Sequence, residues 1–171
     1  MGKARLGFLG VTTVTLAVLV ALGSGCKRKN EYNGIGKWIL GKTMLEDWGY
    51  TCQPSGKMTW CQANPLEKSH VVSLGGQNAV VGTLFDGSEP ASKLVEIVLE
   101  VDGCNVDSLK SWLESEFGDP SGKSDDRMYW KGKYAFIAAQ VPASQATCKI
   151  NMVDPHDEKR VAELEAETKK Q

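Results

Sequence analysis

Apolar and polar side chains alternate along much of the chain after residue 50, which is the pattern of β-strands with a buried face. Glycine-containing turns separate the short runs, so most strands are expected to form hairpins. The predicted strand segments are a hairpin over Tyr50–Gln62, a hairpin of His70–Leu74 with Asn78–Phe85, a single strand Lys93–Val101, a hairpin of Arg127–Lys131 with Lys133–Gln140, and a last strand Thr147–Val153.

The segment Lys93–Val101 has the clearest alternation. It places Val95 and Ile97 on one face of the strand, and Leu94 and Glu96 on the other. Because the glutamate face also carries apolar residues, we expect both faces of this strand to be at least partly covered.

One long segment has helical spacing. Apolar residues recur at intervals of three and four over Val106–Phe117, which predicts a helix that packs on a sheet. Asn105 or Asp107 can cap its start, and Gly118 ends it.

Two further segments have helical signals but little apolar surface. Thr43-Met44-Leu45-Glu46 matches the S/T-x-x-E capping box and predicts a brief helix over Met44–Trp48. The charged tail from Asp157 has ion pairs at helical spacing, but only Val161 and Leu164 could dock it. We therefore expect the tail to be a solvated helix or disordered.

This order of elements predicts an α+β domain, with a mostly antiparallel sheet packed by the main helix and the short N-terminal helix on one face. The domain is expected to cover residues 43–154, followed by the charged tail at 155–171. Two segments, MLEDWGYTCQPSGKMTW and WLESEFGDPSGKSDDRMYW, echo each other. This tandem pattern resembles that of small periplasmic α+β lipoproteins of the outer-membrane assembly-factor kind and of β-lactamase inhibitor proteins, and it carries no binding residue across.

The first 25 residues differ from the rest of the chain. Lys3 and Arg5 precede the uncharged stretch Leu6–Gly25, which ends in small residues. This order is the layout of an export signal, although 20 uncharged residues could also span a bilayer as an uncleaved anchor. A cleaved, soluble secreted protein is a third possibility.

A single cysteine, Cys26, follows the small residues. Gly23-Ser24-Gly25-Cys26 resembles the lipobox of bacterial lipoproteins, although Gly23 stands where the family usually has leucine. The resemblance implies a signal peptide at 1–25, a lipidated Cys26 and a tether over 26–42. It also implies a membrane partner for the lipid and, because Lys27 follows the cysteine, a location in the cell envelope at the outer membrane, facing the periplasm.

If Cys26 carries lipid, four cysteines remain, an even number that favours two disulfides in an oxidising compartment. Of the three possible connectivities we favour Cys52–Cys61 with Cys104–Cys148, since the first pair flanks the turn signal Gln53–Lys57. Zinc sites use closely spaced cysteine pairs, and no two cysteines here are closer than nine positions. We expect no metal and no cofactor.

Charge and candidate catalytic residues exclude several functions. The 171-residue chain has a formal net charge of −1, which gives no basic face for nucleic acid. Ser69 and His70 are neighbours on a predicted strand, so their side chains point to opposite faces and cannot act together as nucleophile and base. We expect His70 to lie on the surface. His156 lies in an acidic turn that is best read as a helix cap. We therefore expect that this chain is not an enzyme.

The tryptophans offer the strongest recognition signal. Trp60 and Trp130 lie in predicted hairpins beside other large side chains, namely Met58, Met128 and Tyr129. Core packing is the more common fate of such residues, but an exposed patch of this kind is typical of protein recognition. The sequence therefore favours a non-catalytic lipoprotein module that binds another envelope protein or has a structural role. The alternative is a groove near Trp60 and Trp130 for a small ligand or cell-wall fragment.

Overall fold

The computed structural model describes residues 31–43, 51–62, 64, 66–143 and 147–170. The predicted signal peptide, Cys26 and the short helix expected at Met44–Trp48 lie outside these ranges. The described elements are β1 (Gly34–Ile35), β2 (Trp38–Ile39), β3 (Thr51–Ser55), β4 (Met58–Gln62), a 3-10 turn (Lys68–His70), β5 (Val71–Leu74), β6 (Gln77–Phe85), β7 (Leu94–Val101), α1 (Val106–Phe117), β8 (Gly122–Lys123), β9 (Arg127–Lys131), β10 (Phe136–Gln140), β11 (Cys148–Val153) and α2 (Glu158–Lys169).

Among the described residues, nine strands form one antiparallel sheet in the order β3-β4-β6-β7-β11-β10-β9-β8, with β5 also paired to β6. The three predicted hairpins are confirmed, as are the single strand and the last strand. Gly75 and Gly76 join β5 to β6 with φ values of 56° and 82°. Two successive positive φ angles are what a tight two-residue hairpin turn needs, and glycine adopts them without strain.

One face of the sheet, called the first face, holds the main core. Ile97, Met152 and Ile137 lie in register across β7, β11 and β10, and all three are buried. Helix α1 covers this row with Leu109 and Leu113, and its start is capped by Asn105, whose side chain accepts a hydrogen bond from the Ser108 amide. The helix and its bounds match the prediction.

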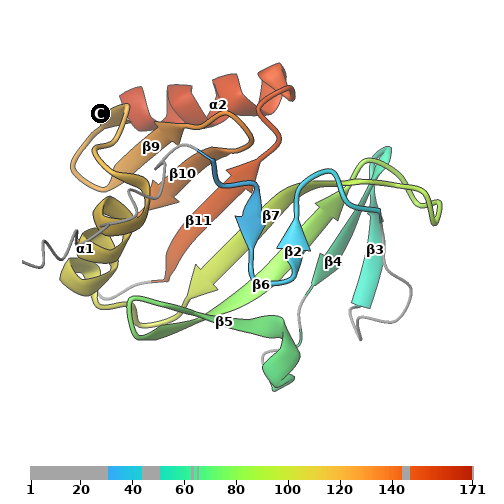
Figure 1. Cartoon of the computed structure of the whole chain (residues 1–171), viewed down its shortest axis with the longest axis horizontal. Helices are drawn as coiled ribbons and strands as arrows, with labels where there is room; N and C mark the ends of the chain where they lie inside the picture. Colours follow the sequence, from blue (N-terminus) through green and yellow to red (C-terminus); the bar gives the residue numbers. More distant parts are fainter. Residues whose placement is uncertain (1–30, 44–50, 63, 65, 144–146, 171) are drawn as a thin grey trace, which may run out of the picture.

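The β1–β2 hairpin covers another part of the first face, in front of β6 and β7 in Figure 1. Trp38 is 2% exposed and belongs to the main core, with Tyr32, Ile35 and Leu40 packed against it. The expected tether over 26–42 therefore differs from the structure, since residues 32–40 are part of the domain. This segment has too few alternating positions to be recognised as strands from sequence.

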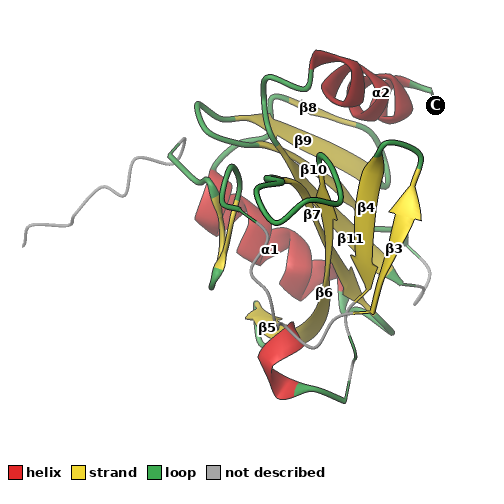
Figure 2. Cartoon of the chain, turned by 90° about the vertical axis from the view of Figure 1, so that its right-hand side faces the viewer, coloured by secondary structure: helices red, strands yellow, loops and turns green. Residues whose placement is uncertain are grey.

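Helix α2 lies on the opposite, second face, so the described helices cover both faces rather than one (Figure 2). It packs against β8, β9 and β10, with Leu164 buried and Val161 in contact with the same cluster. Asp157 caps its start by accepting a hydrogen bond from the Arg160 amide at 3.1 Å. The tail is thus helical, as one of the two expectations had it, but one side of the helix is docked on the sheet while the other side is exposed to solvent.

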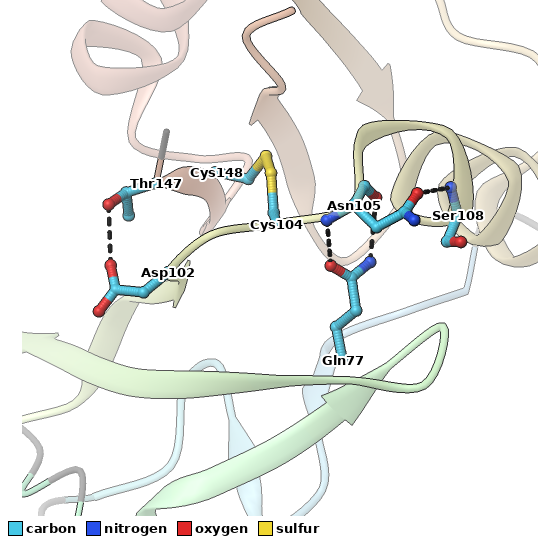
Figure 3. The surroundings of a disulfide bond; sticks show 7 residues. All are labelled: Gln77, Asp102, Cys104, Asn105, Ser108, Thr147 and Cys148. Atoms are coloured by element: carbon cyan, nitrogen blue, oxygen red, sulfur yellow. Dashed lines mark hydrogen bonds between the residues drawn. A yellow bond between two sulfur atoms is a disulfide. The ribbon is translucent and has the colours of Figure 1, made fainter. Parts of the chain in front are cut away.

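Both predicted disulfides are present. Cys52 and Cys61 are directly opposite in the β3–β4 ladder, with Cα atoms 4.0 Å apart. The second bond joins Cys104, at the β7–α1 connection, to Cys148 at the start of β11. Asn105 follows Cys104, and its backbone exchanges two hydrogen bonds with the Gln77 side chain (Figure 3). The β7–α1 connection is therefore held by the disulfide to β11 and by hydrogen bonds to the start of β6.

Candidate binding groove

The structure does not bring the five predicted patch residues together. Met128 and Trp130 are buried on the first face, where the Trp130 indole N–H donates to the Gly118 carbonyl at 2.8 Å. Tyr129 is buried on the second face beneath α2, stacked on Phe136. Only Met58 and Trp60 lie on a surface that remains partly exposed, and that surface is the open half of the second face.

The open half of the second face is formed by β3, β4, β6 and β7, since α2 packs on β8, β9 and β10. On this face Met58, Trp60, Val80 and Leu84 are partly exposed apolar side chains, whereas Val98 and Glu96 are buried. A bulge between β6 and β7 adds Val95 to the partly exposed apolar side chains. Phe85 pairs with Leu94 and Leu84 pairs with Glu96, so Val95 lies between the two pairs. Val95 therefore lines the second face and Leu94 joins the main core, the reverse of the predicted alternation.

Trp60 is the centre of this surface. The six-membered ring of its indole lies over Gly82 of β6, close enough that a Cβ on Gly82 would come within 2.5 Å of the ring atom Cη2. Gly82 does not have a positive φ, so its backbone does not require glycine. Glycine is required at this position by the indole of Trp60, because any larger residue would displace the ring from the sheet.

A groove runs along the strands on both sides of Trp60. Its first lobe has a volume of about 410 Å³ and lies toward the N-terminus of α2, while its second lobe has a volume of about 330 Å³ and lies toward the end of β7. Trp60 and Val98 line both lobes, so they form one continuous surface. The first lobe is also lined by Ser55, Met58, Leu84, Val95, Glu96, Lys149, Asn151, Asp157, Lys159, Arg160 and Glu163, and the second by Gln62, Val80, Gly82, Glu100 and Asp102.

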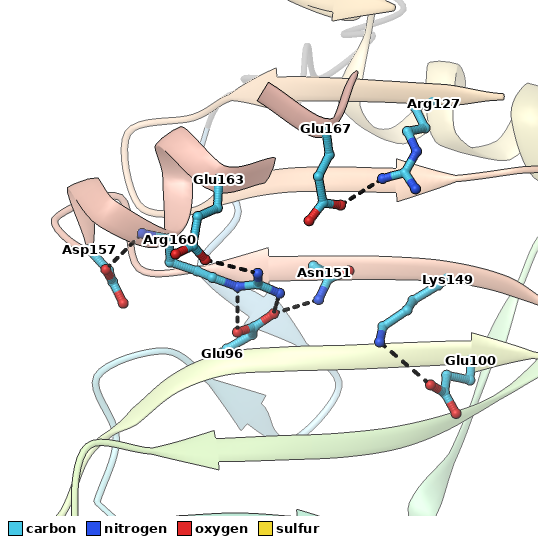
Figure 4. A network of polar contacts seen from close by, with 9 residues as sticks. All are labelled: Glu96, Glu100, Arg127, Lys149, Asn151, Asp157, Arg160, Glu163 and Glu167. Atoms are coloured by element: carbon cyan, nitrogen blue, oxygen red, sulfur yellow. Dashed lines mark hydrogen bonds and ion pairs between the residues drawn. The ribbon is translucent and has the colours of Figure 1, made fainter. Parts of the chain in front are cut away.

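An ion pair between the buried Glu96 and the partly exposed Arg160 forms part of the wall of the first lobe (Figure 4). Glu96 is 5% exposed and accepts two hydrogen bonds from Arg160, at 3.1 Å from Nε and 3.0 Å from Nη2. Asn151 donates a further hydrogen bond to Glu96, and Arg160 also contacts Glu163 at 3.4 Å. The hydrogen bonds to Glu96 raise the pKa of Arg160, so the guanidinium stays charged and compensates the buried carboxylate.

The second lobe has a different charge. Its two charged lining residues among those described are Glu100 and Asp102, both exposed. Lys149 lies 3.8 Å from Glu100, and Asp102 accepts a hydrogen bond from the Thr147 hydroxyl at 2.8 Å. Two carboxylates beside one lysine leave this end of the groove negative.

The other candidate residues are placed apart from the groove. His70 is 0% exposed, which corrects the expected surface position, and its Nδ1 accepts a hydrogen bond from the Asn64 amide at 3.1 Å. Ser69 bonds instead to Glu67. His156 contacts Asp154 at 2.9 Å in the exposed turn before α2. Within the described ranges, no three His, Cys, Asp or Glu side chains are grouped so that they could hold a metal ion.

Comparisons with known proteins add no assignment. No family model, curated protein or solved structure matches the chain. Neither α1 nor α2, the α-helices in the part of the chain that the structure describes, is long and apolar enough to cross a membrane.

Proposed function

We propose that this chain is an exported lipoprotein, acylated at Cys26, whose domain binds another envelope protein through the groove around Trp60. The observation that carries the binding role is the placement of Trp60 over Gly82, in the middle of a groove of mixed apolar and polar lining on a half-sheet that no described element covers. Tryptophan and methionine are enriched at protein interfaces, and a desolvated tryptophan is a frequent centre of binding energy.

The cysteines support export. The two disulfides use four of the five cysteines and leave Cys26 for a different role. Stable disulfides are typical of oxidising compartments, and an acylated cysteine would hold the domain at the membrane it was exported across. The lipobox resemblance and Lys27 favour the outer membrane.

Acylation is tested by labelling growing bacterial cells with a palmitate analogue. The wild-type chain is expected to take up the label and Cys26→Ala to lose it. Ser24→Ala is the matched control, because it keeps a small residue before the cysteine and should still be labelled. A Cys26→Ala protein labelled as strongly as the wild type would reject the lipoprotein assignment.

The binding role is tested by affinity capture from solubilised envelope with the full chain as bait. Trp60→Ala should lose a partner protein that the wild type retains. Tyr134 is also an exposed aromatic residue, at 43% exposure, but it lies outside the groove lining, so Tyr134→Ala should keep the partner. Equal capture by both variants would show that the groove is not the binding site.

A cell-wall fragment is the second candidate ligand, since Trp60 lies next to hydrogen-bonding groups such as Gln62 and Glu100. Tryptophan fluorescence titration with envelope extracts, before and after protease treatment, separates the two ligands. Loss of the response after protease treatment supports a protein partner, whereas an unchanged response supports the fragment.

A further inference from the structure

The shape of the groove restricts what can reach Trp60. Helix α2 stands on the same face beside the first lobe, where Arg160 and Glu163 line the groove. A helix is about 10 Å across, so α2 keeps the flat surface of a large domain away from the sheet. The groove follows β7 from Glu96 to Glu100, a distance of about 13 Å at the rise of a β-strand. A single chain segment fits this space.

A second copy of this chain offers no matching segment through α2, its most prominent element on this face. The side chains that α2 exposes to solvent include Lys159, Glu163 and Lys169. These charged groups would lose hydration against the apolar floor of the groove without gaining partners there.

The floor of the groove favours a protein over a glycan. In addition to Gln62 and Glu100 of the second lobe, Trp60 is flanked by Leu84, Val98 and Val80, three aliphatic side chains that provide no hydrogen-bonding group. The hydroxyl groups of a sugar pressed against them would be left unsatisfied, at a cost for each group, whereas apolar side chains would gain from the burial.

The negative end of the groove defines the charge of the occupant. Glu100 and Asp102 line the second lobe, whose lining holds no basic residue among those described, and Glu100 forms an ion pair with Lys149 at 3.8 Å. Complementary charge steers association and selects partners. A lysine or arginine would balance the excess carboxylate at this end.

From these observations, and resting on the proposed function, we propose that the occupant of the groove is a single basic segment of another envelope protein. Its apolar side chains pack against Trp60 and Leu84, and a lysine or arginine lies between Glu100 and Asp102. The segment runs along the strands, beside α2.

The test is photo-crosslinking in cells with the full-length chain carrying p-benzoylphenylalanine in place of Met58, a lining residue of the first lobe. Mass spectrometry then identifies the crosslinked peptide. We expect a segment of another exported protein with lysine or arginine within about six residues of the crosslink, about 20 Å of extended chain. Reversing the charge with Glu100→Lys and Asp102→Lys together should lower the crosslink yield about tenfold, as expected for like charges at an interface.

Two further variants separate charge from folding. Glu114→Lys makes the same change on the exposed side of α1 and should leave the yield unchanged. Glu100→Lys alone, at an exposed side chain, should give a partial loss. Capture of an acidic segment, a glycan or a second copy would overturn the inference, as would a yield that ignores the charge reversal. A wild-type protein that crosslinks to nothing would overturn the proposed function as well.

Discussion

At the scale of single residues, the contact between Trp60 and Gly82 defines the candidate site. The glycine lies in the middle of β6, where its missing side chain leaves space for an indole from the neighbouring strand. A residue that normally weakens a strand therefore lies where an aromatic ring approaches the backbone.

Gly82→Ala is expected to displace the Trp60 ring with little loss of stability. The backbone at residue 82 can accept alanine, whose better strand propensity offsets the movement, so the free energy of unfolding should change by less than about 1 kcal/mol. Tryptophan emission should shift, and partner capture should fall. The control is Gly82→Ala in a Trp60→Phe background, where the emission shift must vanish. A shift that persists would place its origin at another tryptophan.

Tyr32 gives a second residue-level prediction. Burial and the hydrogen bond to Glu116, at 2.7 Å, raise the pKa of its phenol to about 12. Because the folded-state pKa is above the unfolded value of about 10, this interaction contributes stability below pH 10 and loses it as the pH rises to 12. The absorbance of tyrosinate at high pH should therefore show a late step that Tyr32→Phe removes. Tyr134→Phe should leave that step in place.

At the scale of elements, α2 is held on the sheet by ion pairs as well as by apolar contact, and the Glu96–Arg160 pair is the most buried of these ion pairs. Leu164 is its one buried aliphatic side chain within the described residues, whereas Arg160 reaches the buried Glu96. Arg160→Met should destabilise the domain by about 3 kcal/mol, because it leaves the Glu96 carboxylate buried without a counter-charge.

Denaturant unfolding measures this loss, and hydrogen exchange should show that α2 is affected first. Lys131→Met is the control: its ion pair with Glu165 is at 2.7 Å but the lysine is 58% exposed, so the loss should be below about 1 kcal/mol. Equal losses for the two variants would contradict the larger contribution expected of the Glu96–Arg160 pair.

The two disulfides should contribute unequally. The sequence separations are 9 residues for Cys52–Cys61 and 44 for Cys104–Cys148. In the chain-entropy model the shorter loop gives about 2.7 kcal/mol and the longer about 4 kcal/mol. Replacing both cysteines of the second pair by alanine should therefore cost more in denaturant unfolding than replacing both of the first. The reverse order would show that native-state packing, and not loop entropy, decides the difference.

At the scale of the whole molecule, local patterns predicted the longer elements but not the faces on which their side chains lie. The α1 helix, its Asn105 cap and the disulfides follow from spacing and chain composition. Met58-Thr59-Trp60 and Met128-Tyr129-Trp130 are alike in sequence, yet Trp60 lies on the second face and Trp130 on the first. The difference comes from long-range pairing, which local alternation does not contain.

The docking of α2 and the groove beside it were beyond prediction for a related reason. Helical spacing shows that a segment can form a helix, but it does not show where the helix docks. The docking contact joins Arg160 to Glu96, which are 64 residues apart in the sequence. A signal for the Trp60 site existed in the glycine of a strand-like run, Val80-Val81-Gly82-Thr83, which marks a possible close approach. Its partner could be named only once the β4–β6 register was known.

The route of the chain across the first face has a consequence for orientation. Tyr32 contacts Glu116 and Phe117 of α1, so the chain joins the domain on the side that α1 covers. The groove is on the reverse side of the sheet. If a lipid upstream of Glu31 holds the domain, the first face, which α1 covers, would lie toward the bilayer and Trp60 would point away from it. An approaching protein could then reach Trp60 without displacing the lipid anchor.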